Sequence, residues 1–211
     1  MAGRVITVAQ QKGGSGKTTV AVNLAVALRG RGQSVAILDT DPQGSMGRWY
    51  LERLERRGED EDLEFGTSSA WGASYESEKL KKRFDYVIID TPPKIDSDLR
   101  PALRVADLVV VPVATSQVDL WATEGVLDLA RREKCDTLIV LNRTRAHTRL
   151  TGEVAQGAAD LGAEVAGAQL ANRVAYAESL GQGQGAGELS RNATARAEIE
   201  ALLDEVLERL G

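Results

Sequence analysis

An apolar stretch that runs into a glycine-rich loop and then into a helical pattern constrains this chain most. Residues 4–10 read RVITVAQ, a β-branched run, and residues 18–32 read TTVAVNLAVALRGRG, with apolar residues at helical spacing until glycines end the pattern. Between them lies QKGGSGK, where backbone N–H groups free of large side chains can converge on an anion at a helix N-terminus. The sequence therefore predicts a strand, a phosphate-binding loop and a helix in succession.

Nearly continuous apolar runs recur along the chain and alternate with stretches of helical spacing. Such runs are typical of strands that are buried on both faces of a parallel sheet. The alternation predicts an α/β fold with a doubly wound, mostly parallel sheet and helices on both faces, and residues 1–211 are expected to form a single domain. The expected strands are residues 34–41, 84–93, 107–116 and 135–143, with a short edge strand over 63–69, and the expected helices are 44–57, 77–84, 98–106 and 118–133.

The last part of the chain is rich in glycine. Residues 179–192 read SLGQGQGAGELSRN, which predicts the most flexible stretch of the protein, and a final helix is expected over residues 193–210. The tryptophans Trp49, Trp71 and Trp121 are far apart in the sequence. We expect them to pack helices rather than to contact a ligand.

The composition excludes several classes of protein. With 26 basic and 31 acidic residues the formal charge is −5, so any binding of nucleic acid must come from a local basic patch. Cys135 is the single cysteine, which excludes an internal disulfide and a cysteine-based zinc or iron–sulfur site built within one chain. The sequence has no run of eighteen apolar residues and no signal-peptide core at its start, so a cytoplasmic protein is expected.

The glycine-rich loop predicts a site for the phosphates of ATP. Lys17 is placed to reach the β- and γ-phosphates, and the Thr18 hydroxyl is placed to bind Mg²⁺. The common pattern has a glycine five residues before Gly16, where this chain has Gln11, followed by a second lysine, Lys12. The expected nucleotide contacts are Gly13, Gly14, Ser15, Gly16, Lys17, Thr18 and Thr19.

The segment KGGSGKTT resembles the deviant Walker A signature of the ParA/MinD family of ATPases, and the resemblance extends along nearly the whole chain. DTDPQGS resembles the family's switch I, VIIDTPP its Walker B and switch II, and VVVPVATSQVDLWA the strand and loop that follow. The short length, the DTDPQ form and the glycine-bearing loop before the last helix are most similar to small plasmid-partition ParA proteins such as ParF. The resemblance implies a P-loop ATPase that hydrolyses ATP to ADP and phosphate.

The resemblance assigns roles to three residues. Lys12 matches the signature lysine, which in the family crosses to the ATP of a second subunit in a face-to-face dimer and stabilises charge that grows in the transition state. Asp41 resembles the switch I aspartate that orients the attacking water, and Asn142 resembles the asparagine that reads adenine. The alternatives are a solvated loop lysine for Lys12, a strand-end cap for Asp41 and a turn residue for Asn142.

Acidic residues at strand ends predict the metal site. Asp90 ends the buried run YVIID, and an acid at this place beside Thr18 would hold Mg²⁺ through water. Asp39 lies two residues before Asp41 on the same face of its strand, where it would support either Mg²⁺ or the loop, and strand-end capping is the alternative. The expected metal-binding set is Thr18, Asp39 and Asp90.

The resemblance also implies partners. Members of the family form ATP-dependent homodimers that bind DNA non-specifically, position a plasmid, chromosome or other cargo over the nucleoid, and are released when a ParB-type or other cargo adaptor stimulates hydrolysis. Arginines can neutralise DNA phosphates without reading bases, which gives weak and salt-sensitive binding. The alternative for each arginine is an ordinary solvated side chain with no DNA contact. The expected DNA contacts are Arg143, Arg145, Arg149, Arg173 and Arg191.

Two other functions share parts of this pattern. A MinD-like, membrane-associated division-site ATPase would end in a basic amphipathic helix, whereas the last helix here is mainly acidic. Because anionic lipid repels an acidic helix, no stable membrane association is expected. A metabolic P-loop ligase or kinase would not need Lys12 to act in a second subunit. The acidic residues of the last helix are Glu198, Glu200, Asp204, Glu205 and Glu208, against Arg196 and Arg209.

Overall fold

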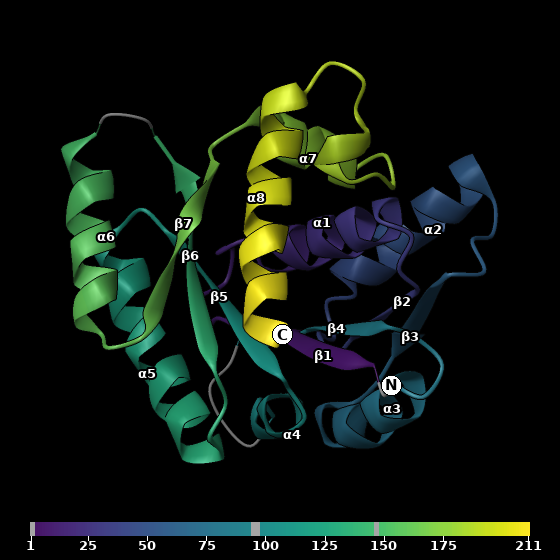
Figure 1. Cartoon of the computed structure of the whole chain (residues 1–211), viewed down its shortest axis with the longest axis horizontal. Helices are drawn as coiled ribbons and strands as arrows, with labels where there is room; N and C mark the ends of the chain where they lie inside the picture. The colour runs from purple at the N-terminus through teal and green to yellow at the C-terminus, as the bar shows by residue number, and fades with distance from the viewer. Residues whose placement is uncertain (1–2, 94–97, 146–147) are drawn as a thin grey trace.

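The computed structural model describes residues 3–93, 98–145 and 148–211, and within them seven strands form one sheet in which the pairings are parallel. The order across the sheet is β3-β2-β4-β1-β5-β6-β7 (Figure 1). The predicted α/β fold with a doubly wound parallel sheet is confirmed. The strands are β1 (Arg4–Val8), β2 (Val35–Asp39), β3 (Leu63–Thr67), β4 (Tyr86–Asp90), β5 (Leu108–Ala114), β6 (Thr137–Thr144) and β7 (Glu164–Ala171).

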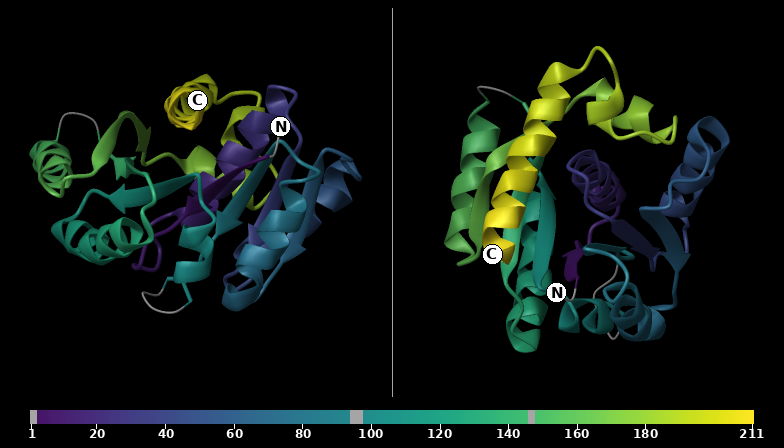
Figure 2. Two further views of the ribbon diagram at one scale, coloured as in Figure 1. Left: turned by 60° about the horizontal axis from the view of Figure 1, so that its bottom comes forward. Right: turned by 45° about the vertical axis from the view of Figure 1, so that its right-hand side comes forward.

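Helices cover both faces of the sheet (Figure 2). One face packs in a single apolar cluster against α1 (Lys17–Gly30), α2 (Ser45–Arg57), α7 (Val174–Leu180) and α8 (Ala193–Leu210). The other face packs in two smaller clusters against α3 (Ala73–Leu80), α4 (Arg100–Arg104), α5 (Gln117–Glu133) and α6 (Arg149–Asp160). Two short 3-10 turns are η1 (Ala70–Gly72) and η2 (Ala186–Glu188).

Strand β1 lies in the middle of the sheet and positions the glycine-rich loop. Val5, Ile6 and Val8 are fully buried, and Ile6 lies beside Ile88 of β4 and Leu108 of β5. Burial of each such side chain stabilises the fold by about 1.5–3 kcal/mol. Connections leave the carboxyl end of β1 and of its neighbours toward opposite halves of the sheet, which is where ligands bind in folds of this kind.

The hydrophobic pattern of the sequence does not predict three elements near the end of the chain, namely α6, β7 and α7. Strand β7 reads EVAGAQLA, and Ala166 and Leu170 are its buried residues. It lies at the edge of the sheet beside β6, where α8 holds it: the carboxylate of Glu205 accepts hydrogen bonds from the N–H groups of Gly167 and Ala168. A strand at the edge needs no continuous apolar run, so its sequence gives only a weak signal.

The helix expected over residues 77–84 lies earlier, at Ala73–Leu80. The chain turns after Leu80, and Phe84, 7% exposed, packs in the same apolar cluster as Val5. The N–H of Gly3 donates to the carbonyl of Lys81 at 2.7 Å, so the start of β1 fixes this turn. Tertiary contact therefore overrides the helical spacing of residues 81–84.

The tryptophans do not share one role. Trp49 is 2% exposed and packs in the core, as expected. The expectation is wrong for Trp71 and Trp121, which are 73% and 65% exposed. Wide spacing in the sequence does not distinguish a buried aromatic residue from an exposed one.

The glycine-rich residues 179–192 are packed against α1 and α2, contrary to the expected flexibility. The N–H of Ala186 donates to Asn23 Oδ1 of α1 at 2.7 Å. A Cβ atom at Gly185 would lie 2.8 Å from Val26 Cγ1, closer than real Cβ atoms approach. The glycines here permit close contact between backbone and helix.

Candidate functional site

A cavity of about 650 Å³ opens at the carboxyl end of β1. Its size is within the range of small-molecule sites. The beginning of α2 and the end of α7 form further parts of its wall. Ser15 of the loop is buried, and its hydroxyl has no hydrogen-bond partner among the described residues. The other predicted phosphate contacts line the cavity, whereas Asn142, the predicted adenine contact, does not: the lining includes Gly13, Gly14, Gly16, Lys17, Thr18 and Thr19.

The loop holds its shape through Gly16 and Asn142. Gly16 has φ 95°, a left-handed conformation, and a Cβ atom there would lie 2.2 Å from Asn142 Nδ2. The Asn142 amide donates to the Ser15 carbonyl at 2.8 Å, and its Oδ1 accepts from the Arg143 N–H at 2.8 Å. Both ends of this amide are thus engaged by the chain itself, which favours the turn-residue alternative; its contact with adenine stays a prediction.

Lys17 is the first residue of α1 and is 7% exposed. Burial lowers the pKa of Lys17, and the negative charges of Asp90 and Asp41 oppose that effect. A phosphate group in the cavity would supply the counter-charge that this buried ammonium group needs. The position and the environment of Lys17 fit its predicted role.

Thr18 and Asp90 form the expected pair at the metal position. Thr18 Oγ1 donates to Asp90 Oδ2 at 2.6 Å, while the other carboxyl oxygen, Oδ1, is buried without a partner among the described residues. Burial raises the pKa of Asp90 to about 7. A cation beside Oδ1 would give that oxygen a partner and stabilise the charged carboxylate, so these residues fit Mg²⁺.

Asp39 lies beside this pair with its oxygens already engaged. Its Oδ1 accepts from the Asp41 N–H at 2.9 Å, and its Oδ2 accepts from the Gly47 N–H at 3.4 Å. Burial raises the pKa of Asp39. This arrangement favours support of the loop over direct metal binding. Mg²⁺ commonly takes few protein ligands together with phosphates and waters, and the described residues contain no group of three acidic, histidine or cysteine side chains fit to hold a metal.

Asp41 follows β2 and lines the cavity. Its Oδ1 accepts from the Gln43 N–H at 3.0 Å, and its carbonyl accepts from the Gly44 N–H at 2.9 Å. The carboxylate is therefore held at the cavity wall, just before α2. Its predicted role in orienting water stays a prediction.

Lys12 is held by a residue that the sequence analysis missed. Its Nζ lies 2.5 Å from Asp119 Oδ2 of α5, and the Asp119 side chain is 5% exposed, compared with 37% for Lys12. Ser116 caps α5 by accepting from the Asp119 N–H at 3.1 Å, and its hydroxyl also donates to the Asp119 carboxylate. A serine followed three residues later by an acid is a capping signal that marks this position in the sequence. Lys12 is therefore more than a solvated loop lysine.

The two glutamines before Lys12 also contact α5. Gln10 Nε2 donates to Thr123 Oγ1 at 3.0 Å. Gln11 lies against Gly125, where a Cβ atom would come within 2.2 Å of Gln11 Nε2. Three successive loop residues are thus docked on one helix, which explains why a side chain replaces the usual glycine at position 11.

Two of the predicted DNA-binding arginines have contacts of another kind. Arg143 has φ 54° and lines the cavity. Arg173 pairs with Glu198 of α8 at 2.6 Å, and Tyr176 donates to the same carboxylate at 2.8 Å. The charge of Arg173 is therefore neutralised within the chain.

The other three predicted arginines are exposed. Arg145 and Arg191 are exposed, and the Arg149 side chain is 91% exposed although it pairs with Glu153 at 2.7 Å. These arginines belong to, or lie close to, the carboxyl ends of β6 and β7 and the beginnings of α6 and α8. These ends of the four elements are at the top of Figure 1. The structure thus places these arginines at one edge of the molecule.

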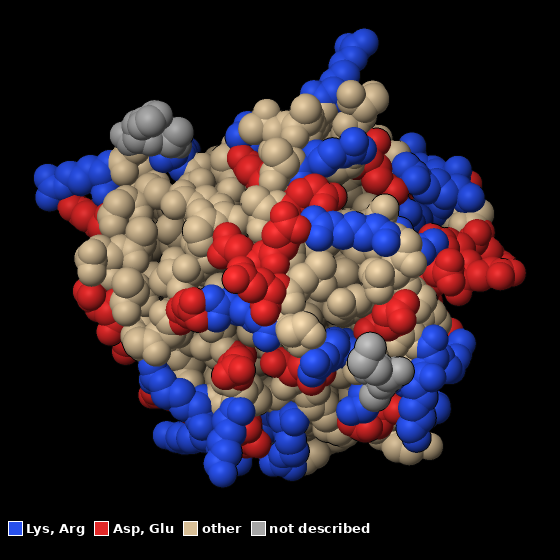
Figure 3. All heavy atoms as spheres, in the orientation of Figure 1, with Lys and Arg blue, Asp and Glu red and all other residues tan. Residues whose placement is uncertain are grey.

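The last helix, α8, is covered by acidic side chains in the face shown in Figure 3. Arg31, directly after α1, pairs with Glu200 at 2.6 Å and with Asp204 at 2.7 Å. The acidic residues therefore join α8 to the rest of the fold. In the described part of the chain, no helix has the length and apolar character needed to cross a membrane.

Comparison with known proteins gives consistent results. The model of the family described as the CobQ/CobB/MinD/ParA nucleotide binding domain matches residues 6–186. The maintenance of carboxysome distribution protein A of Halothiobacillus neapolitanus is 28% identical over 209 residues, which cover 96% of this chain and 95% of that protein. The chromosome-partitioning ATPase Soj of Thermus thermophilus is 36% identical over 151 residues, 60% of this chain and 59% of Soj. Several chromosome-partitioning relatives are thus matched over less than two thirds of their own length.

The fold is also that of solved relatives. The crystal structure of a plasmid partition protein from Borrelia burgdorferi B31 bound to AMPPNP superposes with a TM-score of 0.78 at 19% identity, covering 98% of this chain and 99% of that one. The family match extends over most of the chain and includes the loop, Thr18 and Asp90. The chain therefore belongs to the CobQ/CobB/MinD/ParA family of nucleotide-binding domains.

Proposed function

We propose that this chain is an ATPase that forms an ATP-dependent homodimer, binds DNA non-specifically and positions a plasmid, chromosome or other cargo over the nucleoid. One observation supports the dimer: Lys12 belongs to the phosphate loop but does not line the cavity, and its Nζ lies 2.5 Å from Asp119 of α5. A lysine that is 37% exposed and does not line the cavity of its own chain is available to the nucleotide of a second molecule.

In this proposal each residue acts at a stated place. Lys17 binds the β- and γ-phosphates, and Asp41 orients the attacking water. Mg²⁺, held by Thr18 and Asp90, supplies charge neutralisation at the phosphates. The partner subunit's Lys12 stabilises the charge that grows at the γ-phosphate, an effect that in arginine fingers raises the rate roughly 10³- to 10⁵-fold.

The proposed partners follow from charge. Two copies in a dimer bring two sets of Arg145, Arg149 and Arg191 together, and this doubles the number of phosphates that can be neutralised. A cargo-bound adaptor of the ParB type would then stimulate hydrolysis and release the dimer. The names of relatives support positioning of a cargo, chromosomes for some and carboxysomes for another. The acidic α8 argues against the MinD-like membrane alternative, and the rim position of Lys12 argues against a metabolic ligase.

The test is the oligomeric state of Lys12→Ala with a nonhydrolysable ATP analogue. We expect the variant to bind the analogue with a Kd close to that of the wild type but to elute as a monomer, because only the contact with the second nucleotide is lost. Lys17→Ala should lose the nucleotide itself in calorimetry. Lys82→Ala, which removes an exposed lysine from the turn after α3, is the control and should dimerise normally.

An undiminished dimer peak for Lys12→Ala would show that this lysine does not act across subunits. Normal ATP binding by Lys17→Ala would instead overturn the phosphate loop as the nucleotide site. A chain that turns over ATP only with a small-molecule acceptor, as a monomer, would favour the ligase alternative.

A further inference from the structure

The segment that follows α7, residues 181–185, packs directly against helix α2; we call it the closing segment. Gly183 has φ 64°, and a Cβ atom there would lie 2.2 Å from Arg53 N and 2.5 Å from Arg53 Cα. Because these are backbone atoms of a helix, they cannot move aside as a flexible side chain does. Only glycine permits this contact.

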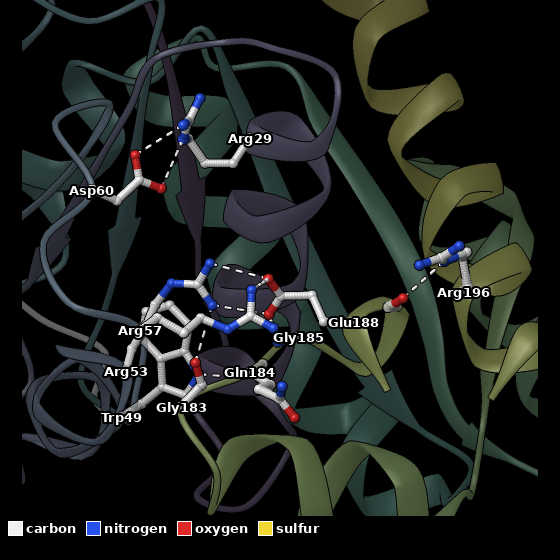
Figure 4. A network of polar contacts seen from close by, with 11 residues as sticks. Arg29, Trp49, Arg53, Arg57, Asp60, Gly183, Gln184, Gly185, Glu188 and Arg196 are labelled. Atoms are coloured by element: carbon white, nitrogen blue, oxygen red, sulfur yellow. Dashed lines mark hydrogen bonds and ion pairs between the residues drawn. The ribbon is translucent and has the colours of Figure 1, made fainter. Parts of the chain in front are cut away.

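Polar contacts from α2 hold the closing segment in place (Figure 4). Trp49 Nε1 donates to the Gln184 carbonyl at 3.1 Å, and Arg53 Nη1 donates to the Gly183 carbonyl at 3.0 Å. Arg53 also grips both carboxyl oxygens of Glu188, at 2.9 and 3.1 Å. Glu188 in turn accepts from the Gly185 N–H at 2.8 Å, which closes the network.

This network is buried, although a charged pair is costly to bury. Arg53 is 7% exposed, and the Glu188 side chain is 17% exposed. Glu188 also pairs with Arg57 at 2.8 Å, so it keeps a partner when Arg53 is removed, whereas removing Glu188 leaves the buried Arg53 without its carboxylate. Such pairs add little net stability relative to apolar residues of the same size. The pair therefore fixes a geometry more than it strengthens the fold.

The geometry that it fixes belongs to the wall of the 650 Å³ cavity. Trp49 and Glu52 line the cavity from α2, Leu180 lines it from the end of α7, and Gly181 lines it from the closing segment. Arg53 lies one residue beyond Glu52 and joins these two walls without lining the cavity itself. The same helix begins beside the acidic residues of the site, since the Gly47 N–H donates to Asp39 at 3.4 Å.

We propose that Arg53, through Glu188 and the Gly183 carbonyl, is a positioning residue that holds the closing segment as a wall of the nucleotide site and thereby sets nucleotide affinity. The inference rests on the proposed nucleotide binding. Without Arg53 the closing segment becomes ordered only when the nucleotide binds. The free-energy cost of that ordering is subtracted from the binding free energy, so ADP and ATP both bind more weakly.

The test compares ADP binding by Arg53→Met, Glu188→Gln and Asp60→Asn. ADP is used because it separates binding from dimer formation. Asp60→Asn breaks a similar two-pronged arginine pair, with Arg29 at 2.8 and 3.2 Å, on a turn outside the cavity lining. We expect the Kd for ADP to rise roughly tenfold in Arg53→Met and roughly threefold in Glu188→Gln, which keeps the Gly183 contact, and to stay within about twofold in Asp60→Asn.

A second readout reports the position of the wall. In a Trp71→Phe, Trp121→Phe background, Trp49 is the sole tryptophan, and the two replaced side chains are exposed. Arg53→Met should shift Trp49 emission to longer wavelength without nucleotide, and ADP should partly reverse the shift. In the wild-type chain, ADP should slow hydrogen exchange at residues 180–188, a measurement that needs no variant to fold.

The outcomes are separable. Kd values within twofold of the wild type for both Arg53→Met and Glu188→Gln, with lowered melting temperatures, would assign the network to stability alone and overturn the inference. Unchanged exchange at residues 180–188 on ADP binding would also overturn it. Loss of ADP binding in Lys17→Ala alone would keep the nucleotide site while rejecting Arg53, whereas a wild-type chain that binds neither ADP nor ATP would overturn the proposed function itself.

Discussion

At the scale of single residues, the buried carboxylate of Asp119 holds Lys12. In one chain Lys12 Nζ and Asp119 Oδ2 are 2.5 Å apart, and Ser116 remains beside Asp119 as a second partner. To reach the nucleotide of another subunit, Lys12 must leave this contact. Asp119 is not left alone when it does, because the Ser116 hydroxyl still donates to it.

We expect Asp119→Asn to promote dimerisation. The substitution keeps the shape of the side chain but removes its charge, so Lys12 is released at lower cost. The concentration of ATP analogue at half-maximal dimer should fall roughly threefold to tenfold, as measured by light scattering. Asp128→Asn, which breaks an exposed pair with Arg131 on the same helix, is the control. An unchanged midpoint for Asp119→Asn would mean that Asp119 does not restrain Lys12.

At the scale of elements, α6 packs on α5 through a glycine. A Cβ atom at Gly157 would lie 2.4 Å from Leu120 Cδ2, and Leu120 is 7% exposed. Gly152 lies on the same helix with nothing within 4 Å of its Cβ position. Substitution of Gly152 therefore tests helix propensity alone, whereas substitution of Gly157 tests helix propensity together with the packing of α6 on α5.

Alanine substitutions at these glycines should have different effects on stability. Gly152→Ala should stabilise the chain by about 0.5–1 kcal/mol, because alanine has the higher helix propensity. Gly157→Ala should lose that gain, because Leu120 must shift within a packed cluster, which typically costs about 1–3 kcal/mol. Urea unfolding of the two variants measures the difference. Equal stabilisation by both would show that α6 does not pack closely on α5.

At the scale of the whole molecule, a net acidic chain must concentrate its positive charge to hold DNA. The formal charge is −5, and α8 adds a region of negative charge to the face in Figure 3. Arg145, Arg149 and Arg191 are exposed at the opposite end of the strands from the turn between α5 and β6. One chain offers few such contacts, so the proposed dimer is the form that should bind DNA.

We expect Arg145→Glu with Arg149→Glu to weaken DNA binding by the ATP-analogue form equally on unrelated sequences. Each lost phosphate contact lowers the slope of log affinity against log salt by about 0.9, so the salt dependence should flatten. Nucleotide binding should be unaffected. Arg132→Glu with Lys134→Glu changes the charge equally at the far end of α5 and serves as the control. Gel shifts across a salt series measure DNA binding by both double variants. Equal weakening by the two would mean that only the net charge matters. Binding of the wild-type chain to anionic liposomes instead of DNA would favour the membrane alternative.

Local chemistry was predictable from the sequence. The apolar runs predicted the strands of the central sheet, and the loop with Lys17 and Thr18 lines the cavity where it was expected to bind phosphates. Even the contact between Thr18 and Asp90, 72 residues apart, was expected, because both follow strands whose carboxyl ends share one edge of a parallel sheet. The strands and the loop depend on periodicity and spacing within single segments, and the Thr18–Asp90 contact follows from the order of the strands in a parallel sheet.

Other features were decided only when distant segments packed. Asp119 lies 107 residues from Lys12, and Glu188 lies 135 residues from Arg53, so no local pattern marks either pair. The glycine-rich residues 179–192 look flexible in the sequence because glycine has the widest conformational freedom, yet the same lack of a side chain lets them pack against α1 and α2. By itself, the sequence determined which side chains can take part in chemistry. The tertiary structure decided which of these side chains are buried and which residues they pair with, because burial and pairing depend on neighbours that the order of the chain does not reveal.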